Sequence, residues 1–599
     1  MAVEELAALA RGRSALASSC PRYARTGARR HRDVARWRLP ASAAARAEGT
    51  TSAKRAICSG REMVRGGDAR ASSSGRHRAP ERGIILRRRG VSSSFGEAYR
   101  GDDDVRGDDD DASSTSSSSS NSSSRDVDVA SSSSLPPLLR VPTATAAIAV
   151  GTPMMAMGLL RSAFNLTDAY WAGKLGATDL SALCYNAFAL WMLLLVANVV
   201  GTGLQARVSA FVGAGDSHSV SRIVTQGLWG ALFAYAALAC FAPFAPTLYA
   251  AGLGIDLDVG GAWRSAGGKT HLLATLLGSF GMFASTVLDA TWRGLGRTRP
   301  ALCVTALSTI LALTLNPALM LGWGPFPKLG IVGAAVGFSA AQCVGAAAHA
   351  AALKRVHGLT IAMARPCAKD IWGMVRIGAP LASAGVVFTL VYIAIGRIAS
   401  ACGENYLAAM GLGQKFEALA FTVCEGFRLA CATLVGQWIG AGRPREARDA
   451  ALVIVAMCAA CMVPFACVLF CFGPALVATF SSDPSIVAAA GGYLRWNSGA
   501  LVFLAIEAVA EGCFTGVGNT VPILAIGGAI NVLRVPAAYF LSIACGWGIS
   551  GVWFTLVTSQ ILKGLSKFAW FHLRAMRGVI DEADADAEKR GAGGGVATS

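Results

Sequence analysis

Two short stretches of the chain decide its fold. Gly176-Ala-Thr-Asp-Leu-Ser-Ala-Leu183 is matched 227 positions later by Gly403-Glu-Asn-Tyr-Leu-Ala-Ala-Met410. Pro153 and Pro380 are separated by the same interval. Shorter matches continue in the same order and pair residues 211–215 with 438–442, 294–300 with 516–522, and 330–333 with 548–551. The chain is therefore an internal duplication.

Twelve apolar segments surround these motifs, and each is long enough to cross a bilayer as a helix. They are residues 144–167, 180–205, 222–245, 269–292, 301–322, 330–352, 374–399, 405–436, 449–472, 486–512, 522–544 and 547–571. Lipid offers no partner to the backbone of an open sheet, so these segments are predicted to be helices. The sequence thus predicts an all-α integral membrane protein whose twelve transmembrane helices form two six-helix bundles around a central cleft.

The duplication sets the predicted domain boundaries. A first bundle is expected at 138–358, a connection at 359–373 and a second bundle at 374–577. Because six is even, the two bundles have the same orientation and are related by an axis along the membrane normal. Such bundles can rock around a central site, and nothing resembles the repeated selectivity filter of a channel.

Basic residues alternate between the predicted connections. Seventeen Lys and Arg, counting Lys563 and Lys567 in the final tail, fall on the side of the even-numbered connections, against six on the other side. The positive-inside rule then places both termini on the inner side of the membrane.

Composition excludes a soluble enzyme and separates the membrane region from its tails. Of 599 residues, 53% are hydrophobic and only 15% are charged, whereas soluble domains carry about 25% charged residues. Residues 1–100 hold 22 Lys and Arg against 8 Asp and Glu, which gives a balance of +14. We expect residues 1–137 and 578–599 to be disordered tails, because neither can bury a core.

The first tail has the composition of an organellar address. It is rich in Arg and Ser and has no apolar run typical of a secretory signal. We expect a transit region and a chloroplast envelope location, with the mitochondrial, plasma and vacuolar membranes as alternatives. A nucleic-acid partner is not expected, because no aromatic residues are interleaved for base stacking.

Catalytic and metal motifs are absent from the sequence. It has no phosphate loop, no G-x-S-x-G elbow and no histidine cluster with metal spacing. Cys458 and Cys461 form a lone C-x-x-C without a second pair, so we expect no metal site and treat the cysteines as small packing residues. The protein is predicted to be neither an enzyme nor a cofactor carrier.

Several motifs resemble the multidrug and toxic compound extrusion (MATE) family of transporters. Pro153 with Leu166-Thr-Asp-Ala-Tyr-Trp-Ala-Gly-Lys-Leu-Gly176 is similar to the first-helix signature of that family. Val200-Gly-Thr-Gly-Leu-Gln205 and Leu434-Val-Gly-Gln-Trp-Ile-Gly-Ala-Gly-Arg443 resemble the paired ends of its second and eighth helices. The resemblance covers roughly residues 140–577.

This resemblance implies an antiporter that exports organic solutes, either cations or organic acids, in exchange for H⁺ or Na⁺. We expect the protein to be a monomer. The major facilitator fold also has two six-helix repeats, but its Asp- and Arg-rich loop is replaced here by residues 213–222. A lipid-linked saccharide flippase of related fold and a membrane scaffold without transport remain as alternatives.

Carboxylates at membrane depth are the first candidates for ion coupling, since they are costly there unless they act. Asp168 lies in the resembling motif, with Asn165 three residues earlier on the same helical face. The family commonly has Asn and Asp four residues apart on the fifth helix, whereas this chain has Ala312 and Asn316. Asp289 is a candidate for the missing acid, or it pairs with Arg293 one turn later.

A second candidate pair lies in the second bundle. Glu507 and Glu511 are one turn apart on the tenth segment, so we expect them to share a proton or to bind Na⁺. The polar side chains expected to line the substrate cleft are Asn198, Gln205, Tyr392 and Glu425, of which Glu425 has Arg428 as an alternative partner.

Overall fold

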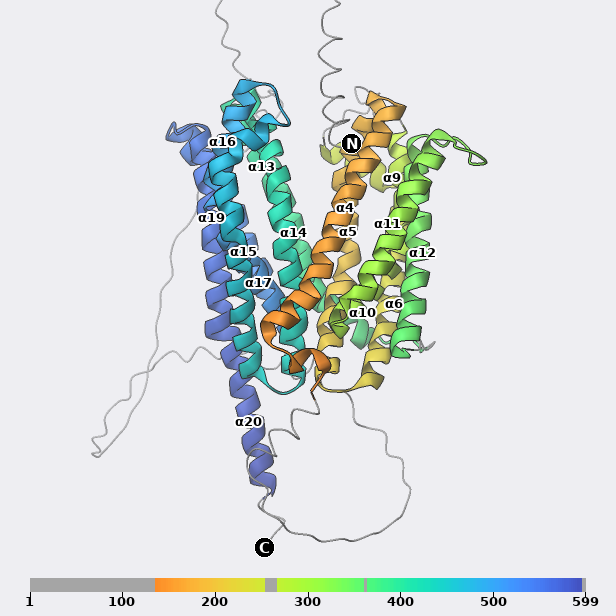
Figure 1. The fold of residues 1–599 in the computed structure, drawn as a ribbon, viewed down its shortest axis with the longest axis vertical. Coiled ribbons are helices and arrows are strands. Elements are labelled where there is room, and N and C mark those ends of the chain that lie inside the picture. Colours follow the sequence, from red (N-terminus) through yellow and green to blue (C-terminus); the bar gives the residue numbers. More distant parts are fainter. Residues whose placement is uncertain (1–134, 254–266, 360–363, 595–599) are drawn as a thin grey trace, which may run out of the picture. The chain divides into compact units, whose positions relative to one another are not determined.

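The computed structural model describes residues 135–253, 267–359 and 364–594. Within these ranges every regular element is a helix, in agreement with the predicted fold class (Figure 1). All but the last three residues of the predicted transit region lie outside the described residues.

The first bundle follows the short 3₁₀ helix η1 (Pro137–Arg140). Its helices are α4 (Thr143–Leu175), α5 (Ala177–Gly213), α6 (Ser217–Phe241), α7 (Ala245–Leu253), α9 (Gly268–Gly278), α10 (Phe280–Leu295), α11 (Thr298–Leu321) and α12 (Ile331–His357). In this bundle α10 packs on α5 and α12, and α11 packs on α4 and α12.

The second bundle repeats this arrangement. Its helices are α13 (Ala368–Cys402), α14 (Glu404–Gly440), α15 (Pro444–Ala478), α16 (Pro484–Ser498), α17 (Leu501–Val517), η2 (Ile523–Gly528), α18 (Ala529–Tyr539), η3 (Phe540–Ala544), α19 (Ile549–Trp570), η4 (Phe571–Ala575) and α20 (Met576–Gly594). Here α17 packs on α14, α15 and α19, so α17 is the central helix, as α10 is in the first bundle.

Eleven spans can be recognised in the described part of the chain. Nine helices are long and apolar enough to cross a membrane, and two bent pairs, α9 with α10 and α16 with α17, each have the composition of one more span. The remaining predicted span corresponds to α19, which has 22 residues but is not among these eleven.

The duplication is visible in the backbone itself. The α9–α10 pair bends by 48° and the α16–α17 pair, at the equivalent place, bends by 56°. Gly330 before α12 has φ 58° and ψ −142°, and its equivalent Gly548 before α19 has φ 59° and ψ −142°. A side chain would strain this conformation, so the paired glycines are required by the helix starts.

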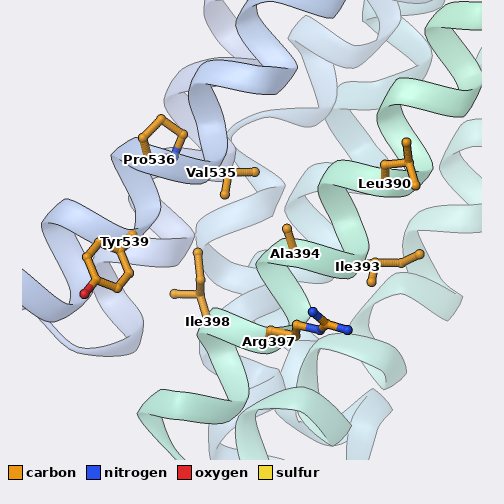
Figure 2. Close-up of a pocket in the computed structure, with 8 residues that line it drawn as sticks. All are labelled: Leu390, Ile393, Ala394, Arg397, Ile398, Val535, Pro536 and Tyr539. Atoms are coloured by element: carbon orange, nitrogen blue, oxygen red, sulfur yellow. The ribbon is translucent and has the colours of Figure 1, made fainter. Parts of the chain in front are cut away.

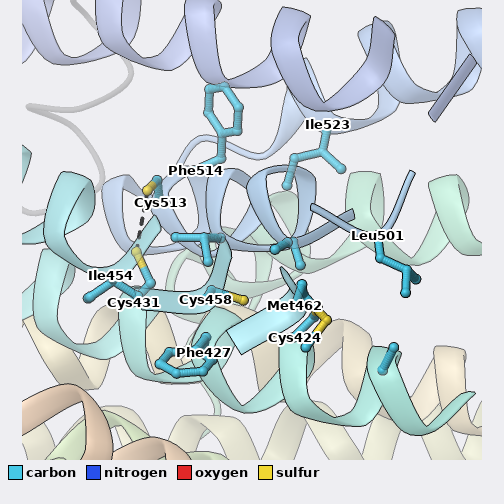
Figure 3. Packing of buried hydrophobic residues seen from close by; sticks show 14 of the residues in the cluster. Cys424, Phe427, Cys431, Ile454, Cys458, Met462, Leu501, Cys513, Phe514 and Ile523 are labelled. Atoms are coloured by element: carbon cyan, nitrogen blue, oxygen red, sulfur yellow. Dashed lines mark hydrogen bonds between the residues drawn. The ribbon is translucent and has the colours of Figure 1, made fainter. Parts of the chain in front are cut away.

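The cysteines of the second bundle pack as apolar side chains. Cys424, Cys431, Cys458 and Cys513 are buried among the core residues of α14, α15 and α17 (Figure 3). The thiols of Cys431 and Cys513 are 3.3 Å apart, and all the cysteines of the described ranges are free. The described residues contain no group of ligands that would hold a metal ion.

The two bundles meet along α5 with α13 and along α4 with α14. Glycines permit this contact: a Cβ on Gly378 would lie 1.7 Å from the carbonyl oxygen of Val199, and one on Gly203 would lie 2.1 Å from that of Met374. We call the end at which α5 turns into α6 and α14 turns into α15 the basic end (residues 214–216 and 441–443). The glycine contacts continue to this end, where Gly213 and Gly440 close on the opposite bundle.

Three sequence-based expectations are corrected by the structure. The second bundle begins at Ala368, within the predicted connection, and the predicted C-terminal tail is helical as far as Gly594. Lys563 and Lys567 lie inside α19 and are only 3% and 2% exposed, so they do not belong to the basic tail.

Candidate functional site

Asp168 and Asn316 form the polar centre of the first bundle. The Nδ2 of Asn316, on α11, donates a hydrogen bond of 2.8 Å to the Oδ1 of Asp168, on α4. Asn316 is buried and Asp168 is half-buried. Gly337 makes room for this pair, because a Cβ there would lie 2.5 Å from the Oδ1 of Asn316. The structure thus brings together two predicted residues, whereas Asn165 is exposed one turn away.

Asp289 has a different partner. Its Oδ2 lies 3.4 Å from the Nε of Arg293, one turn later on α10, which is the ion pair that the sequence left open. The Asp289 carboxylate also acts electrostatically on the imidazole of His349, a buried residue of α12. Asp289 therefore interacts with charged or titratable groups of α10 and α12, within the first bundle.

Two lysines from α19 change the predicted carboxylate pair of the second bundle. The Nζ of Lys567 lies 2.6 Å from an oxygen of Glu507 and 2.6 Å from an oxygen of Glu511. The Nζ of Lys563 lies 3.1 Å from the other oxygen of Glu507, which also accepts a hydrogen bond from Gln560. The two carboxylates do not share a proton directly, because an ammonium group stands between them.

These lysines were missed as site residues because charged side chains were assigned to the tail. Their spacing was the available signal, since residues four apart on a helix lie on one face and both fall within the predicted segment 547–571. Glu507, Lys563 and Lys567 are all at most 7% exposed, and a buried charge requires such a partner.

The remaining polar residues of the second bundle form a neighbouring group. The guanidinium of Arg534 on α18 lies over the ring of Tyr392, 5.6 Å from its centre, and its Nε donates to Ser559. Tyr493 donates a hydrogen bond of 2.9 Å to Glu417. Tyr392 therefore packs between α13 and α18, within the second bundle.

The predicted cleft residues Gln205, Asn198 and Glu425 have separate positions. Gln205 is 1% exposed and donates to Leu429 and Thr433 of α14, so it belongs to the contact between bundles and does not line a cleft. Asn198 donates to the backbone of its own helix. Glu425 accepts two hydrogen bonds from Arg428, which confirms the alternative pairing.

A surface groove of about 520 Å³ lies between α13 and α18 (Figure 2). Its walls are mainly aliphatic, with the charge of Arg397 on one side. None of the predicted site residues lines it.

Comparisons with known proteins agree with this arrangement. A family profile described as MatE matches residues 153–318 and 380–540, which is more than half of the chain and includes both bundles. The chain is 25% identical over 427 residues to a protein of Thermotoga maritima named "Probable multidrug resistance protein NorM", covering 71% of this chain and 91% of that protein. A protein of the same name from Deinococcus radiodurans is 28% identical over 445 residues, covering 71% and 94%.

Solved structures share the fold. One described as "Outward-facing conformation of a multidrug resistance MATE family transporter of the MOP superfamily" matches with a TM-score of 0.68 and 21% identity, covering 74% of this chain and 98% of that chain. A second, described as "Crystal structure of MATE in the bent conformation", matches with a TM-score of 0.68 and 20% identity, covering 75% and 98%.

Proposed function

Because the chain belongs to the MATE family of membrane transporters, we propose that it is a proton-coupled antiporter that exports small organic solutes. The observation that carries the proposal is the contact between Asp168 and Asn316. A half-buried carboxylate with one neutral amide partner has no fixed counter-charge, so a proton is the simplest means of neutralising it. Proton binding and release at Asp168 then alternate with solute binding.

Protons are favoured over Na⁺ by the chemistry of the second bundle. Glu507 and Glu511 already have the ammonium groups of Lys563 and Lys567 as partners. Two carboxylates with two fixed cations carry no net charge to attract a metal cation. The exchange ion therefore binds in the first bundle. In the second bundle, Lys563 and Lys567 occupy the positions beside the carboxylates that a cation would otherwise take.

The contact between the bundles supports an alternating-access cycle. In this conformation the bundles are joined over the half that leads to the basic end, by the glycine contacts of α5 with α13 and α14. Rocking of one bundle against the other would separate these contacts and join the opposite ends. One chain contains both bundles, so we propose a monomer as the transport unit.

Uptake into proteoliposomes tests the proposal. With an acidic interior and a panel of organic cations and organic acids outside, we expect solute to enter as protons leave. An Na⁺ gradient alone should give no uptake. Asp168→Asn should abolish proton-driven uptake, whereas Asp216→Asn, on the loop between α5 and α6, should retain it.

The alternatives give different results in the same vesicles. Flux without any response to the pH gradient, or full coupling in Asp168→Asn, would overturn the proposed role of Asp168. Movement of a lipid-linked saccharide alone would favour the flippase, and absence of flux across the whole panel would favour the scaffold.

The chloroplast envelope is the proposed location, on the composition of residues 1–137. A fluorescent reporter fused after residue 137 should enter plastids. A diffuse cytosolic signal would refute this address, and a mitochondrial signal would replace it.

A further inference from the structure

We propose that Arg161, with the charge of Arg293 nearby, binds the carboxylate of an organic anion at the boundary between the two bundles. The inference rests on the proposed transport function and names the class of solute. It depends on three observations: the position of Arg161, the charges around it and the seal beneath it.

Arg161 lies near the middle of α4, at a depth where an arginine facing lipid would be costly. Its side chain is exposed, yet the charges of Asp289 and Arg293 in the first bundle and of Glu425 in the second all act on it. Arg161 is three residues after Gly158, which meets Thr422 of the second bundle, and seven before Asp168, which meets Asn316 of the first. Helical spacing therefore places Arg161 on the face of α4 at the boundary between the bundles. A solute at this boundary would contact both bundles, as alternating access requires.

The groups around Arg161 leave one positive charge without a partner. Arg293 has Asp289 as its ion-pair partner, and Arg428 has Glu425. Glu511 also acts on Arg428, but its carboxylate is already in contact with Lys567. Within the described part of the chain, no carboxylate lies within ion-pair distance of Arg161.

The bundles are sealed immediately below this group, on the side of the basic end. The Oγ1 of Thr433 on α14 donates a hydrogen bond of 2.9 Å to the carbonyl of Arg293, and Gln437 donates one of 3.0 Å to Gly294. On α4, the closest approach to α14 is at Gly151 and Gly158, with Arg161 one turn beyond. A solute that reached Arg161 from the opposite end could therefore not pass farther toward the basic end.

The charge of the groups at this closed end favours an anion. A guanidinium binds a carboxylate through two parallel hydrogen bonds, and the interaction strengthens where water is scarce. Arg293, although paired, adds positive potential nearby. A cationic solute would meet the charge of Arg161, whereas both nearby carboxylates, Asp289 and Glu425, are already paired. The site thus fits organic acids better than organic cations.

Binding to the full-length protein in nanodiscs tests the site without any gradient. The probes are phthalate, succinate and 1,2,3-propanetricarboxylate, with benzyltrimethylammonium as the cation, and binding is measured by equilibrium dialysis. We expect at least one carboxylate to bind and the cation not to bind. Arg161→Gln should weaken carboxylate binding at least tenfold, and Arg161→Lys should restore part of it. Arg397→Gln, which removes an exposed arginine from the groove on α13, is the matched control and should leave binding unchanged.

The outcomes separate the anion site from the transport proposal. Binding of the cation alone, or carboxylate binding that is equal in wild type and Arg161→Gln, overturns the anion site even if proton-driven flux is present. Carboxylate binding that depends on Arg161 supports the site even if no gradient drives flux, in which case the antiport proposal fails alone. Absence of binding of all three carboxylates also overturns the site.

Discussion

The two bundles contain equivalent helices in the same order, but they neutralise their buried acids by different means. In the first bundle, Asp168 has a neutral amide partner, Asn316. In the second bundle, Glu507 has two ammonium partners, Lys563 and Lys567. The first acid therefore has no cationic partner among these contacts, whereas the second has two that belong to the protein.

The repeat shows how this difference arose position by position. Glu511 and Lys567 align with Asp289 and His349, and an electrostatic interaction joins the members of each pair. One acid–base pair is therefore present at equivalent positions in both bundles. It differs in that histidine can lose its charge near neutral pH, whereas lysine does not do so readily.

Another acid–base pair, Glu507 with Lys563, exists only in the second bundle. Glu507 and Lys563 align with Ser285 and Gly345, neither of which carries a charge. A Cβ on Gly345 would lie 2.3 Å from the Oγ of Ser308, so the first bundle has no room for the equivalent lysine. The asymmetry is thus part of the packing of α11 against α12.

Removal of the shared ammonium group should have the largest effect. Lys567→Met leaves Glu511 without its ion-pair partner and Glu507, which is only 7% exposed, with only one. Breaking a buried ion pair costs about 3–5 kcal/mol, so we expect a loss of that size in the free energy of unfolding in detergent. Denaturant titration of the purified protein measures it.

A compensating variant makes this prediction specific. Lys567→Met combined with Glu511→Gln should recover much of the stability, because the unpaired carboxylate is gone. Lys174→Met, at the exposed end of α4, should be close to wild type. Equal stability of Lys567→Met and Lys174→Met would show that the second bundle does not need its fixed cations.

The paired glycines of the two bundles should differ next most strongly. Gly151 and Gly378 are equivalent in the repeat, but a Cβ on Gly378 would lie 1.7 Å from a carbonyl oxygen of α5, and one on Gly151 would lie 3.2 Å from that of Gly426. Overpacking typically costs about 1–3 kcal/mol, and a clash with backbone cannot be relieved by a rotamer change. Gly378→Ala should therefore destabilise this conformation by at least that amount.

Accessibility reports the separation of the bundles directly. A cysteine introduced at Ala210, against Gly440, should react with a maleimide faster in Gly378→Ala than in Gly151→Ala. The same rate in both variants would mean that the α5–α13 contact does not hold the basic end closed.

The comparison of the bundles also shows what the sequence can predict. The duplication and the helical segments follow from residue spacing alone, whereas spacing offers the pairing of Asp289 with Arg293 only as one of two alternatives. Asp168 and Asn316 were both named as candidates, but their contact joins residues 148 positions apart and follows from the packing of α4 on α11. The spacing of residues along one helix cannot predict a contact between two helices.

The second bundle was harder to predict for a physical reason. From sequence alone, two carboxylates one turn apart are expected to repel each other. The lysines that relieve this repulsion come from α19, 56 to 60 positions away, so spacing along α17 does not reveal them. Gln205 illustrates the opposite error. A polar residue in an apolar helix was expected to face solute, but it satisfies its hydrogen bonds at the contact with α14.

Two amides test the difference in coupling. Asn316 donates to Asp168 in the first bundle and Gln560 donates to Glu507 in the second. A hydrogen bond to a charged group contributes about 1.5–3 kcal/mol, so Asn316→Ala should reduce proton-driven uptake roughly tenfold. Gln560→Ala leaves two lysines on Glu507 and should change uptake by less than about twofold. The reverse order of effects would move the coupling site to the second bundle.

The smallest expected effect compares the starts of α6 and α15. Asp216 caps α6 by accepting a hydrogen bond of 2.9 Å from the backbone of Ser219, whereas the equivalent Arg443 gives α15 no side-chain cap. Loss of such a cap costs about 1 kcal/mol, so Asp216→Ala should destabilise the first bundle by that amount. Arg443→Asp should stabilise the second by a few tenths of a kcal/mol, partly through the helix dipole.

The pH dependence of the cap gives this prediction its sign. Partial burial raises the pKa of Asp216, but hydrogen bonds from Ser219 and the charge of His218 lower it more, so the pKa lies below its ordinary value. The stability that the cap contributes is therefore complete above the unfolded pKa of about 3.9 and disappears as the pH falls through the lower folded pKa. Wild type and Asp216→Ala should differ in denaturant midpoint at pH 7 and converge near the acid limit. A difference that persists unchanged in acid would mean that the carboxylate charge plays no part in starting α6.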